Sequence, residues 1–359
     1  MNAISVSSAA VRSVCASFAM LCLLTACDSD NNDLFVDACS SSRIFGSSQA
    51  GLVNGCANVA RFSNPANVEV DPTGRVFVAD FDNDAVRVIS TSGIVSTLVS
   101  STSVTPPATF SRPFGLTFAP NGRLYVQTDG NDTGQRDGTT GTIWEVNLTT
   151  RLATVVARNL GRPRGIQALQ NGNIALSDLT HHTISILNPA TAVVTPLAGA
   201  NDTPGFADGT GNIARFNRPY GIALLTDGSL LVADQNNHRL RRITMLGEVT
   251  TVAGGATPGN TNGPVATARF NFPQDVAVVG TAAYVADHDN FLIRRILNGV
   301  VTTEAGSGTQ GFADGEGASA QFFGLEGIAV TLDGNTLWIA DGNNGTGQPF
   351  NRVRRLPTQ

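Results

Sequence analysis

Lysine is absent from this chain of 359 residues, in which all 23 basic residues are arginine. This absence excludes Schiff-base chemistry, a phosphate-loop lysine and Ser-Lys catalysis. Charged residues make up only 14% of the chain, and the net charge of -5 comes without any run of basic residues. Nucleic acid is therefore not expected as a partner. Cysteine is also scarce, and no C-x-x-C spacing suggests a metal or redox site.

One phrase, by contrast, returns six times. Its clearest copy is ARFNRPYGIALLTDGSLLVADQNNHRLRRITMLGEVTTVAG, which starts at Ala214. Each copy combines a Pro-x-Gly step or a variant of it, short alternating apolar runs, Gly turns and a strand that ends in Ala-Asp or a variant of that ending. Such spacing predicts four short antiparallel strands per copy, and each copy buries its apolar face against its neighbours.

The elements P-x-G-I-A, V-A-D-x-x-N and R-[LIV]-R closely resemble the NHL repeat. The resemblance covers nearly all of the chain from about residue 41 and implies an all-β fold, a six-bladed β-propeller of four-stranded blades over residues 41–359. Blades two and six depart most, with Thr128 at the Asp position and Leu325 at the Pro position. The last copy ends after its third strand, NRVRRL. We therefore predict that the segment SRIFGSS from Ser42 closes the ring by completing blade six, because an open ring would leave a sheet edge unpaired.

The residues before the ring read as a targeting segment. Arg12 precedes the apolar stretch from Phe18 to Leu24, which is too short to span a bilayer. The following Leu24-Thr25-Ala26-Cys27 resembles the lipobox of bacterial lipoprotein signal peptides. The resemblance implies removal of residues 1–26, lipidation of Cys27, a polar tether over 27–40 and a membrane-anchored protein of the cell envelope. An ordinary secretory signal cut nearby is the alternative.

Two cysteines, Cys39 and Cys56, remain after the removed segment and the lipidated Cys27. They flank the predicted closing strand, and an exported protein can keep a disulfide. We expect a Cys39–Cys56 bridge that fastens the strand. Two free thiols are the alternative.

The Asp and Asn of the recurring Ala-Asp-x-x-Asn could be mistaken for an active site. Because they recur around the ring, we interpret them as structural: an Asp that ends a strand accepts backbone N–H bonds, and Asn tolerates left-handed turns. Function is expected where the copies differ and the innermost strand reaches the central channel. Blades two to four place arginines at this rim, whereas blades five, six and one place acidic or amide groups there. The ligand-binding candidates are Arg112, Arg162, Arg164, Arg218, Tyr220, Gln274 and His288.

Two sets of oxygen-bearing residues are candidate metal ligands. Asn67, Asp275 and Glu326 are similar to the ligands of lactonase-type six-bladed propellers, although their motif positions do not match. Asp129, Asn131, Thr133 and Asp137 partly follow the spacing of a calcium loop, without its bidentate Glu. Ca²⁺ or Mg²⁺ would suit such ligands. The alternatives are a structural or solvating role for the trio and a Gly-rich loop without a metal.

Two function classes remain open. The first is a lipid-anchored, monomeric binding module that presents its channel mouth to a protein, peptide, glycan or small anionic ligand in the envelope. The second is a divalent-metal-dependent hydrolase or lyase of the lactonase kind at the same mouth. No histidine stands at a fixed spacing from a nucleophile, and no metal motif matches in full, so binding is favoured over catalysis.

Overall fold

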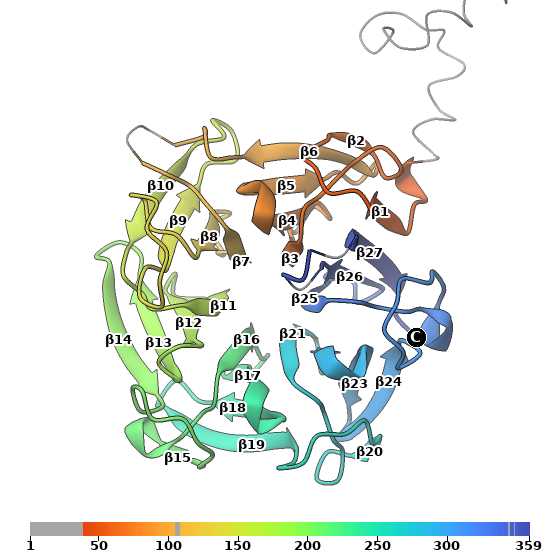
Figure 1. The fold of residues 1–359 in the computed structure, drawn as a ribbon. Coiled ribbons are helices and arrows are strands. Elements are labelled where there is room, and N and C mark those ends of the chain that lie inside the picture. The colour runs from red at the N-terminus through yellow and green to blue at the C-terminus, as the bar shows by residue number, and fades with distance from the viewer. Residues whose placement is uncertain (1–38, 105–107, 344, 348) are drawn as a thin grey trace, which may run out of the picture. The chain divides into compact units, whose positions relative to one another are not determined.

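Each copy of the repeated phrase folds into one antiparallel sheet, and six such sheets surround a central axis as blades (Figure 1). The computed structural model describes residues 39–104, 108–343, 345–347 and 349–359, and Cys39–Gln359 form one compact unit. The predicted six-bladed all-β propeller is confirmed. The predicted signal segment and Cys27 lie outside the described residues. No helix in the described part of the chain has the length and apolarity needed to cross a bilayer.

The strands of each blade are given from the outer edge to the central axis. Blade one comprises β2 (Gly55–Cys56), β6 (Ile94–Val99), β5 (Ala85–Ile89), β4 (Val76–Asp80) and β3 (Pro65–Val70). Blade two comprises β10 (Ala153–Ala157), β9 (Thr142–Val146), β8 (Leu124–Thr128) and β7 (Pro113–Phe118). Blade three comprises β14 (Val193–Ala198), β13 (Thr183–Asn188), β12 (Ile174–Asp178) and β11 (Pro163–Ala168).

Blade four comprises β15 (Gly209–Thr210), β19 (Glu248–Gly254), β18 (Arg239–Ile243), β17 (Leu230–Asp234) and β16 (Pro219–Leu224). Blade five comprises β20 (Gly263–Pro264), β24 (Val300–Ala305), β23 (Leu292–Leu297), β22 (Ala282–Asp287) and β21 (Pro273–Val279). Blade six comprises β1 (Ile44–Ser47), β27 (Asn351–Pro357), β26 (Thr336–Asp341) and β25 (Leu325–Val330). Short 3-10 helices are η1 (Phe81–Asn83), η2 (Gly211–Ile213), η3 (Gln235–Asn237), η4 (His288–Asn290) and η5 (Gly317–Ser319).

The blades differ from the predicted four strands in one respect. Blades one, four and five carry a fifth, two-residue strand that pairs with the outermost long strand. These short strands come from the connection that leads into the blade, and they cover an edge that would otherwise expose unpaired N–H and C=O groups.

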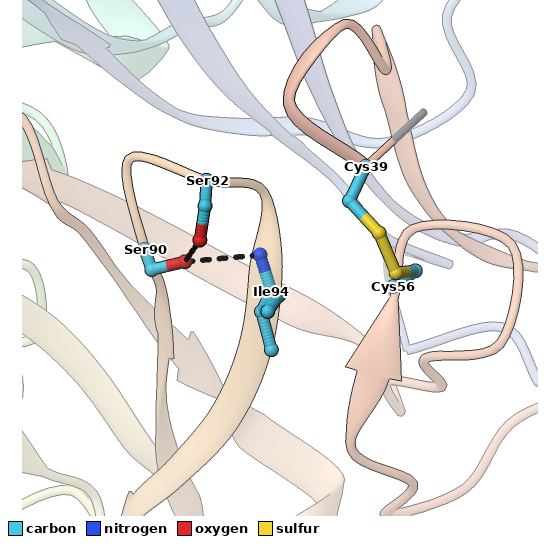
Figure 2. The surroundings of a disulfide bond; sticks show 5 residues. All are labelled: Cys39, Cys56, Ser90, Ser92 and Ile94. Atoms are coloured by element: carbon cyan, nitrogen blue, oxygen red, sulfur yellow. Dashed lines mark hydrogen bonds between the residues drawn. A yellow bond between two sulfur atoms is a disulfide. The ribbon is translucent and has the colours of Figure 1, made fainter. Parts of the chain in front are cut away.

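The ring closes as predicted, because β1 from the N-terminal segment pairs antiparallel with β27 in blade six. The predicted disulfide between Cys39 and Cys56 is also present. It links the residue that leads into β1 of blade six to β2 of blade one, so it spans the seam of the ring. Figure 2 shows the bridge near the β5–β6 turn, where the Ile94 N–H donates to Ser90 Oγ at 3.0 Å. Gly93 in this turn has a φ of +76°, and a Cβ atom at this position would collide with the carbonyl oxygen of Cys39.

The repeated Asp and Arg form the buried polar centre of four blades. In blade one, Arg87 Nη1 donates to Asp80 Oδ2 at 2.9 Å, and its guanidinium lies 5.1 Å from the ring centre of Phe62. Asp80 also accepts from the Ser63 N–H and from Asn83. Both side chains of the ion pair are fully buried. The same arrangement recurs in blades four, five and six, with Asp234–Arg241, Asp287–Arg294 and Asp341–Arg354. The structural interpretation of the Ala-Asp endings is therefore confirmed.

Blade two replaces this ion pair with neutral groups. Trp144 occupies the arginine position of β9 and donates from Nε1 to Thr128 Oγ1 at 2.8 Å. Phe110 packs edge-to-face on Trp144, as the equivalent phenylalanines pack on arginine elsewhere. Apolar contacts between neighbouring blades complete the core, for example Phe77 of blade one, which packs edge-to-face on Phe118 of blade two with ring centres 4.8 Å apart.

Candidate functional site

The six inner strands all begin at one end of the central axis, and each begins with a β-bulge. The register with the second strand shifts directly after the Pro, or after Leu325 in blade six, so the next residue has no partner across the strands. A bulge redirects a side chain at a site of this kind. The six redirected residues, each at most 8% exposed, are Ala66, Phe114, Arg164, Tyr220, Gln274 and Glu326. We call them the bulge ring.

A second set of residues lies at the same end of the axis. It is formed by the residue that directly follows the second strand of each blade, namely Phe81, Asp129, Leu179, Gln235, His288 and Gly342. All six are buried. Only Asp129 and His288 were among the predicted site residues. The signal that could have revealed the others is that this position varies in every copy while the Asp before it recurs in five.

Residues of the second set lie next to bulge-ring residues of the following blade, and the two members of such a pair are similar in polarity. Phe81 of blade one packs edge-to-face on Phe114 of blade two, with ring centres 6.0 Å apart. Leu179 of blade three belongs to the same apolar cluster as Tyr220 of blade four. The imidazole of His288 in blade five acts electrostatically on the Glu326 carboxyl of blade six. One half of the mouth is consequently apolar, formed by Ala66, Phe81, Phe114, Leu179 and the ring of Tyr220.

Arg164 is already neutralised within the protein. Its guanidinium donates to both carboxylate oxygens of Asp129, at 2.7 and 3.0 Å, and lies 4.1 Å from the ring centre of Phe114. Arg162 donates to the same carboxylate at 3.1 Å. Burial alone would raise the pKa of Asp129, but the two arginines outweigh it and hold that pKa below its usual value. The predicted arginine side of the mouth therefore offers no free guanidinium at Arg164 for an anionic ligand.

The other two predicted arginines lie further out. Arg112 stacks over Phe81 at 5.1 Å, and its backbone N–H donates to Asp84. Arg218 is exposed, and its backbone N–H donates to His182 Nδ1. Both adopt a positive φ, of 55° and 57°, which fixes the chain direction just before the Pro of the inner strand. These two residues leave positive charge on the rim rather than at the axis.

The polar half of the mouth consists of Tyr220, Gln274, His288 and Glu326, which we call the polar arc. Apart from arginine Nε atoms, Gln274 Oε1 and His288 Nε2 are the buried side-chain atoms without a hydrogen-bond partner in the described part of the chain. Such atoms are costly to bury unless something binds them. His288 Nδ1 lies 2.6 Å from Asp289 Oδ1. Because a carboxylate only accepts, Nδ1 carries the proton in this contact, and in the tautomer with a single proton on Nδ1 the Nε2 atom is an acceptor.

Glu326 is the titratable group of the polar arc. Burial raises its pKa to about 7, and the nearby His288 and Arg164 oppose this shift. Burial likewise raises the pKa of Tyr220, which stays a neutral hydroxyl. The arc thus offers a hydroxyl, an amide, an imidazole nitrogen and a carboxyl that exchanges its proton near neutral pH.

The predicted trio of Asn67, Asp275 and Glu326 is not brought together as one ligand set. Asn67 and Asp275 lie one residue further along their strands and face the channel, where Asn67 Nδ2 donates to Asp275 Oδ2 at 3.4 Å. Asp275 also accepts from the backbone N–H groups of Val276 and Ile328, both at 2.9 Å. Its oxygens therefore already tie blade five to blade six. Gly221 and Gly327 make this approach possible, since a Cβ there would collide with Asp275 and Asn67.

The predicted calcium loop is also used differently. Asp129 binds the two arginines, while Asn131 Oδ1 accepts from Thr133 and Gln135, and Asp137 Oδ1 accepts from Thr139. These are contacts of Asx turns, in which the loop satisfies its own side chains. Within the described ranges, no group of three or more His, Cys, Asp or Glu side chains has the geometry to hold a metal ion. Asp275, Asp129, Asn131 and Asp137 thus already accept hydrogen bonds or ion pairs from protein groups, and binding of Ca²⁺ or Mg²⁺ stays a prediction.

Comparison with known proteins supports the repeat and the fold. The NHL repeat family matches residues 216–243, which run from Phe216 to the end of β18. NHL repeat-containing protein 2 from Homo sapiens is 37% identical over 123 residues, or 31% of this chain. The match spans 17% of the length of that relative.

Among solved structures, a Bacteroides thetaiotaomicron protein of unknown function has a TM-score of 0.67 at 21% identity and covers 88% of this chain and 75% of its own. An auxiliary nutrient binding protein from the same organism has a TM-score of 0.66 at 17% identity, over 88% and 76%. Virginiamycin B lyase from Staphylococcus aureus has a TM-score of 0.51 at 15% identity, over 83% and 95%. At these identities the structures show a shared fold.

Proposed function

We propose that this NHL-repeat propeller is a binding module whose ligand contacts the polar arc and the apolar half of the channel mouth. The observation that carries this proposal is the pair of unpartnered buried atoms, Gln274 Oε1 and His288 Nε2, beside the Glu326 carboxyl. A ligand that donates hydrogen bonds to them would remove the cost of burying them unpaired. Structures of the same fold that are described as nutrient binding proteins support a binding role by analogy.

The chemistry of the mouth favours an uncharged ligand rich in hydroxyl groups. Arg164 and Arg162 are satisfied by Asp129, so a small anion gains little at the axis. The polar arc provides mixed donors and acceptors, and the ring of Phe114 in the apolar half packs edge-to-face against Tyr220 of the arc, with ring centres 5.7 Å apart. Sugars combine hydroxyl groups with an apolar C–H face, so a neutral glycan suits this mouth better than a phosphate or a carboxylate.

The test is a panel of neutral and acidic oligosaccharides, bound to the full-length chain and then titrated by calorimetry. We expect binding of a neutral saccharide and a loss of about tenfold in affinity in Gln274→Ala, since one hydrogen bond is worth about 1 kcal/mol or slightly more. The matched control is Gln310→Ala, because Gln310 is exposed and does not belong to the arc. Binding of anionic glycans alone would contradict the proposal.

A lyase that works at the same mouth is the second candidate. The observation in its favour is Glu326, whose pKa is raised to about 7 by burial, beside the His288–Asp289 pair. Groups with a pKa near the working pH suit general acid–base catalysis. Quinupristin, which is present in a structure of catalytically inactive virginiamycin B lyase with the same fold, is a suitable probe. Incubation of the full-length chain with quinupristin, followed by liquid chromatography and mass spectrometry, tests this directly. A product that forms with the wild type and not with His288→Ala would support the lyase, and an unchanged substrate would count against it.

We further propose that Cys27 carries lipid and that the propeller is held at the membrane of a bacterial cell envelope as a monomer. The Cys39–Cys56 disulfide supports export, because such bonds persist in oxidising compartments. Growth with a labelled fatty acid should label the wild-type chain, whereas Cys27→Ser should remain unlabelled. Equal labelling of both chains would contradict the anchor.

A further inference from the structure

The central channel contains a cavity that the polar arc does not line. It has a volume of about 240 Å³ and is bounded by residues of all six inner strands. Tyr220, Gln274, His288 and Glu326 are not among its lining residues. The cavity extends from the level of Asn67 and Asp275 toward the ends of the inner strands, which is the opposite end of the axis from the bulge ring.

Two carboxyl groups face this cavity without a cation. The lining residues include Glu69 of β3 and Asp275 of β21, but no arginine or histidine. Glu69 Oε1 accepts from the Phe118 backbone N–H at 3.1 Å, and Asp275 accepts the two backbone bonds described above. Burial raises the pKa of Glu69 to about 8, and the Asp275 carboxylate adds to that shift. Burial raises the pKa of Asp275 to about 7.

The far end of the cavity is apolar. Val70, Leu224 and Val330 line it near the ends of β3, β16 and β25 and are half-buried. Leu332 in the turn after β25 also lines it and is 72% exposed, so this end is open to solvent. We call these four residues the apolar collar. A ligand that enters here meets the apolar collar and the Glu69 carboxyl, which accepts from the last residue of β7, before it reaches Asp275.

We propose that the cavity binds a primary alkylammonium ion, with its nitrogen between Glu69 and Asp275 and its alkyl chain against the apolar collar. An ammonium group has three N–H donors and no acceptor. Glu69 and Asp275 supply two carboxyl groups that a bound ammonium would hold in the ionised form, and the side-chain carbonyl of Asn67, whose amide nitrogen donates to Asp275, supplies a third acceptor. The volume accommodates a short chain, since a water molecule occupies about 30 Å³ of liquid and the cavity holds several.

Calorimetry of the full-length chain with n-butylamine, n-butanol and calcium chloride tests this proposal. We expect saturable binding of n-butylamine and none of n-butanol, which has the same chain without the charge. Glu69→Gln should weaken n-butylamine about tenfold or more, because hydrogen bonds to charged groups are worth about 1.5–3 kcal/mol. The matched control, Glu248→Gln, removes an exposed carboxylate and should leave binding unchanged.

A second variant guards against misfolding of Glu69→Gln. Leu332 is exposed, so Leu332→Lys should fold normally, and its positive charge at the opening should weaken saturable n-butylamine binding. The proposal is overturned if n-butylamine does not bind, if n-butanol binds equally well, or if Leu332→Lys binds n-butylamine like the wild type. It is also overturned if calcium binds in a Glu69-dependent manner while n-butylamine does not. Saccharide binding at the mouth should be unaffected by Leu332→Lys. A failure of the alkylammonium proposal can therefore be distinguished from a failure of the proposed saccharide binding.

Discussion

Removal of Arg294 should destabilise blade five in a pH-dependent way. The side chains of Arg294 and Asp287 are fully buried, and Arg294 Nη1 lies 2.8 Å from Asp287 Oδ2. In Arg294→Met, Asp287 keeps its bonds from the Asn271 N–H and the Asn290 amide but loses its only ion-pair partner among the described residues. Loss of one member of a buried pair costs about 3–5 kcal/mol of unfolding free energy. We expect a loss of that size at pH 8.

The pH dependence follows from the sign of the Asp287 shift. Burial raises the pKa of Asp287 from its usual value to about 6, although Arg294 pulls it down. A carboxyl with a raised folded-state pKa stabilises the fold at low pH and loses that contribution as pH rises through the folded-state pKa. Without Arg294 the pKa rises further, and each added unit costs about 1.4 kcal/mol above about pH 6. The penalty of Arg294→Met should therefore be smaller at pH 5 than at pH 8.

Urea unfolding followed by circular dichroism at both pH values measures this penalty. The double variant Asp287→Asn with Arg294→Met removes the uncompensated charge, so it should be more stable than Arg294→Met at pH 8 and should show no such pH difference. Blade two already uses a neutral pair, Thr128 and Trp144, at the equivalent positions. The reasoning is refuted if the penalty is equal at pH 5 and pH 8, or if the double variant is no more stable at pH 8.

Three further predictions concern the disulfide at the seam of the ring, Glu326 at the mouth, and the contact between Gly221 and Asp275 in the channel. Cys39→Ser should lower the unfolding free energy by about 3 kcal/mol, as expected for a bridge with a sequence separation of 17, and should match the reduced wild type in urea titrations. The pKa of Glu326 is raised to about 7, so ionisation of Glu326 lowers the unfolding free energy of the wild type between pH 5 and pH 8. Glu326→Gln should reduce this loss by up to about 3 kcal/mol. An unchanged dependence of the unfolding free energy on pH would argue against it. Gly221→Ala should lower the thermal midpoint clearly, since its methyl group would meet the Asp275 carboxylate, whereas Gly205→Ala, whose Cβ would lie in ordinary contact with Arg215, should change it little.

The fold was predictable because its determinants are local and repeated. The Ala-Asp endings, the Gly turns and the missing last strand each carry information in a few neighbouring residues. The closing of blade six by β1 and the Cys39–Cys56 bridge followed from counting strands and cysteines. The fifth strands of blades one, four and five were missed because two-residue strands such as Gly55–Cys56 have no periodicity to detect.

The site was predictable only in part. The sequence identified which positions face the axis, but not their height along it, so Glu326 was grouped with Asn67 and Asp275, and Glu69 was overlooked. The charge partner of Arg164 was also hidden, because Asp129 belongs to another blade and lies in a stretch that resembles a calcium loop. Side-chain contacts between blades depend on how the sheets pack, and the sequence of a single repeat does not indicate which residue of the next blade each side chain contacts.

Binding of a neutral saccharide by the polar arc of the mouth can be decided in one titration. The saccharide selected from the panel is titrated into the wild-type full-length chain, Gln274→Ala and Gln310→Ala under identical conditions. We expect saturable binding to the wild type, a loss of about tenfold in affinity in Gln274→Ala and no change in Gln310→Ala. Equal affinity of all three chains, or no saccharide bound by the wild type, would contradict it.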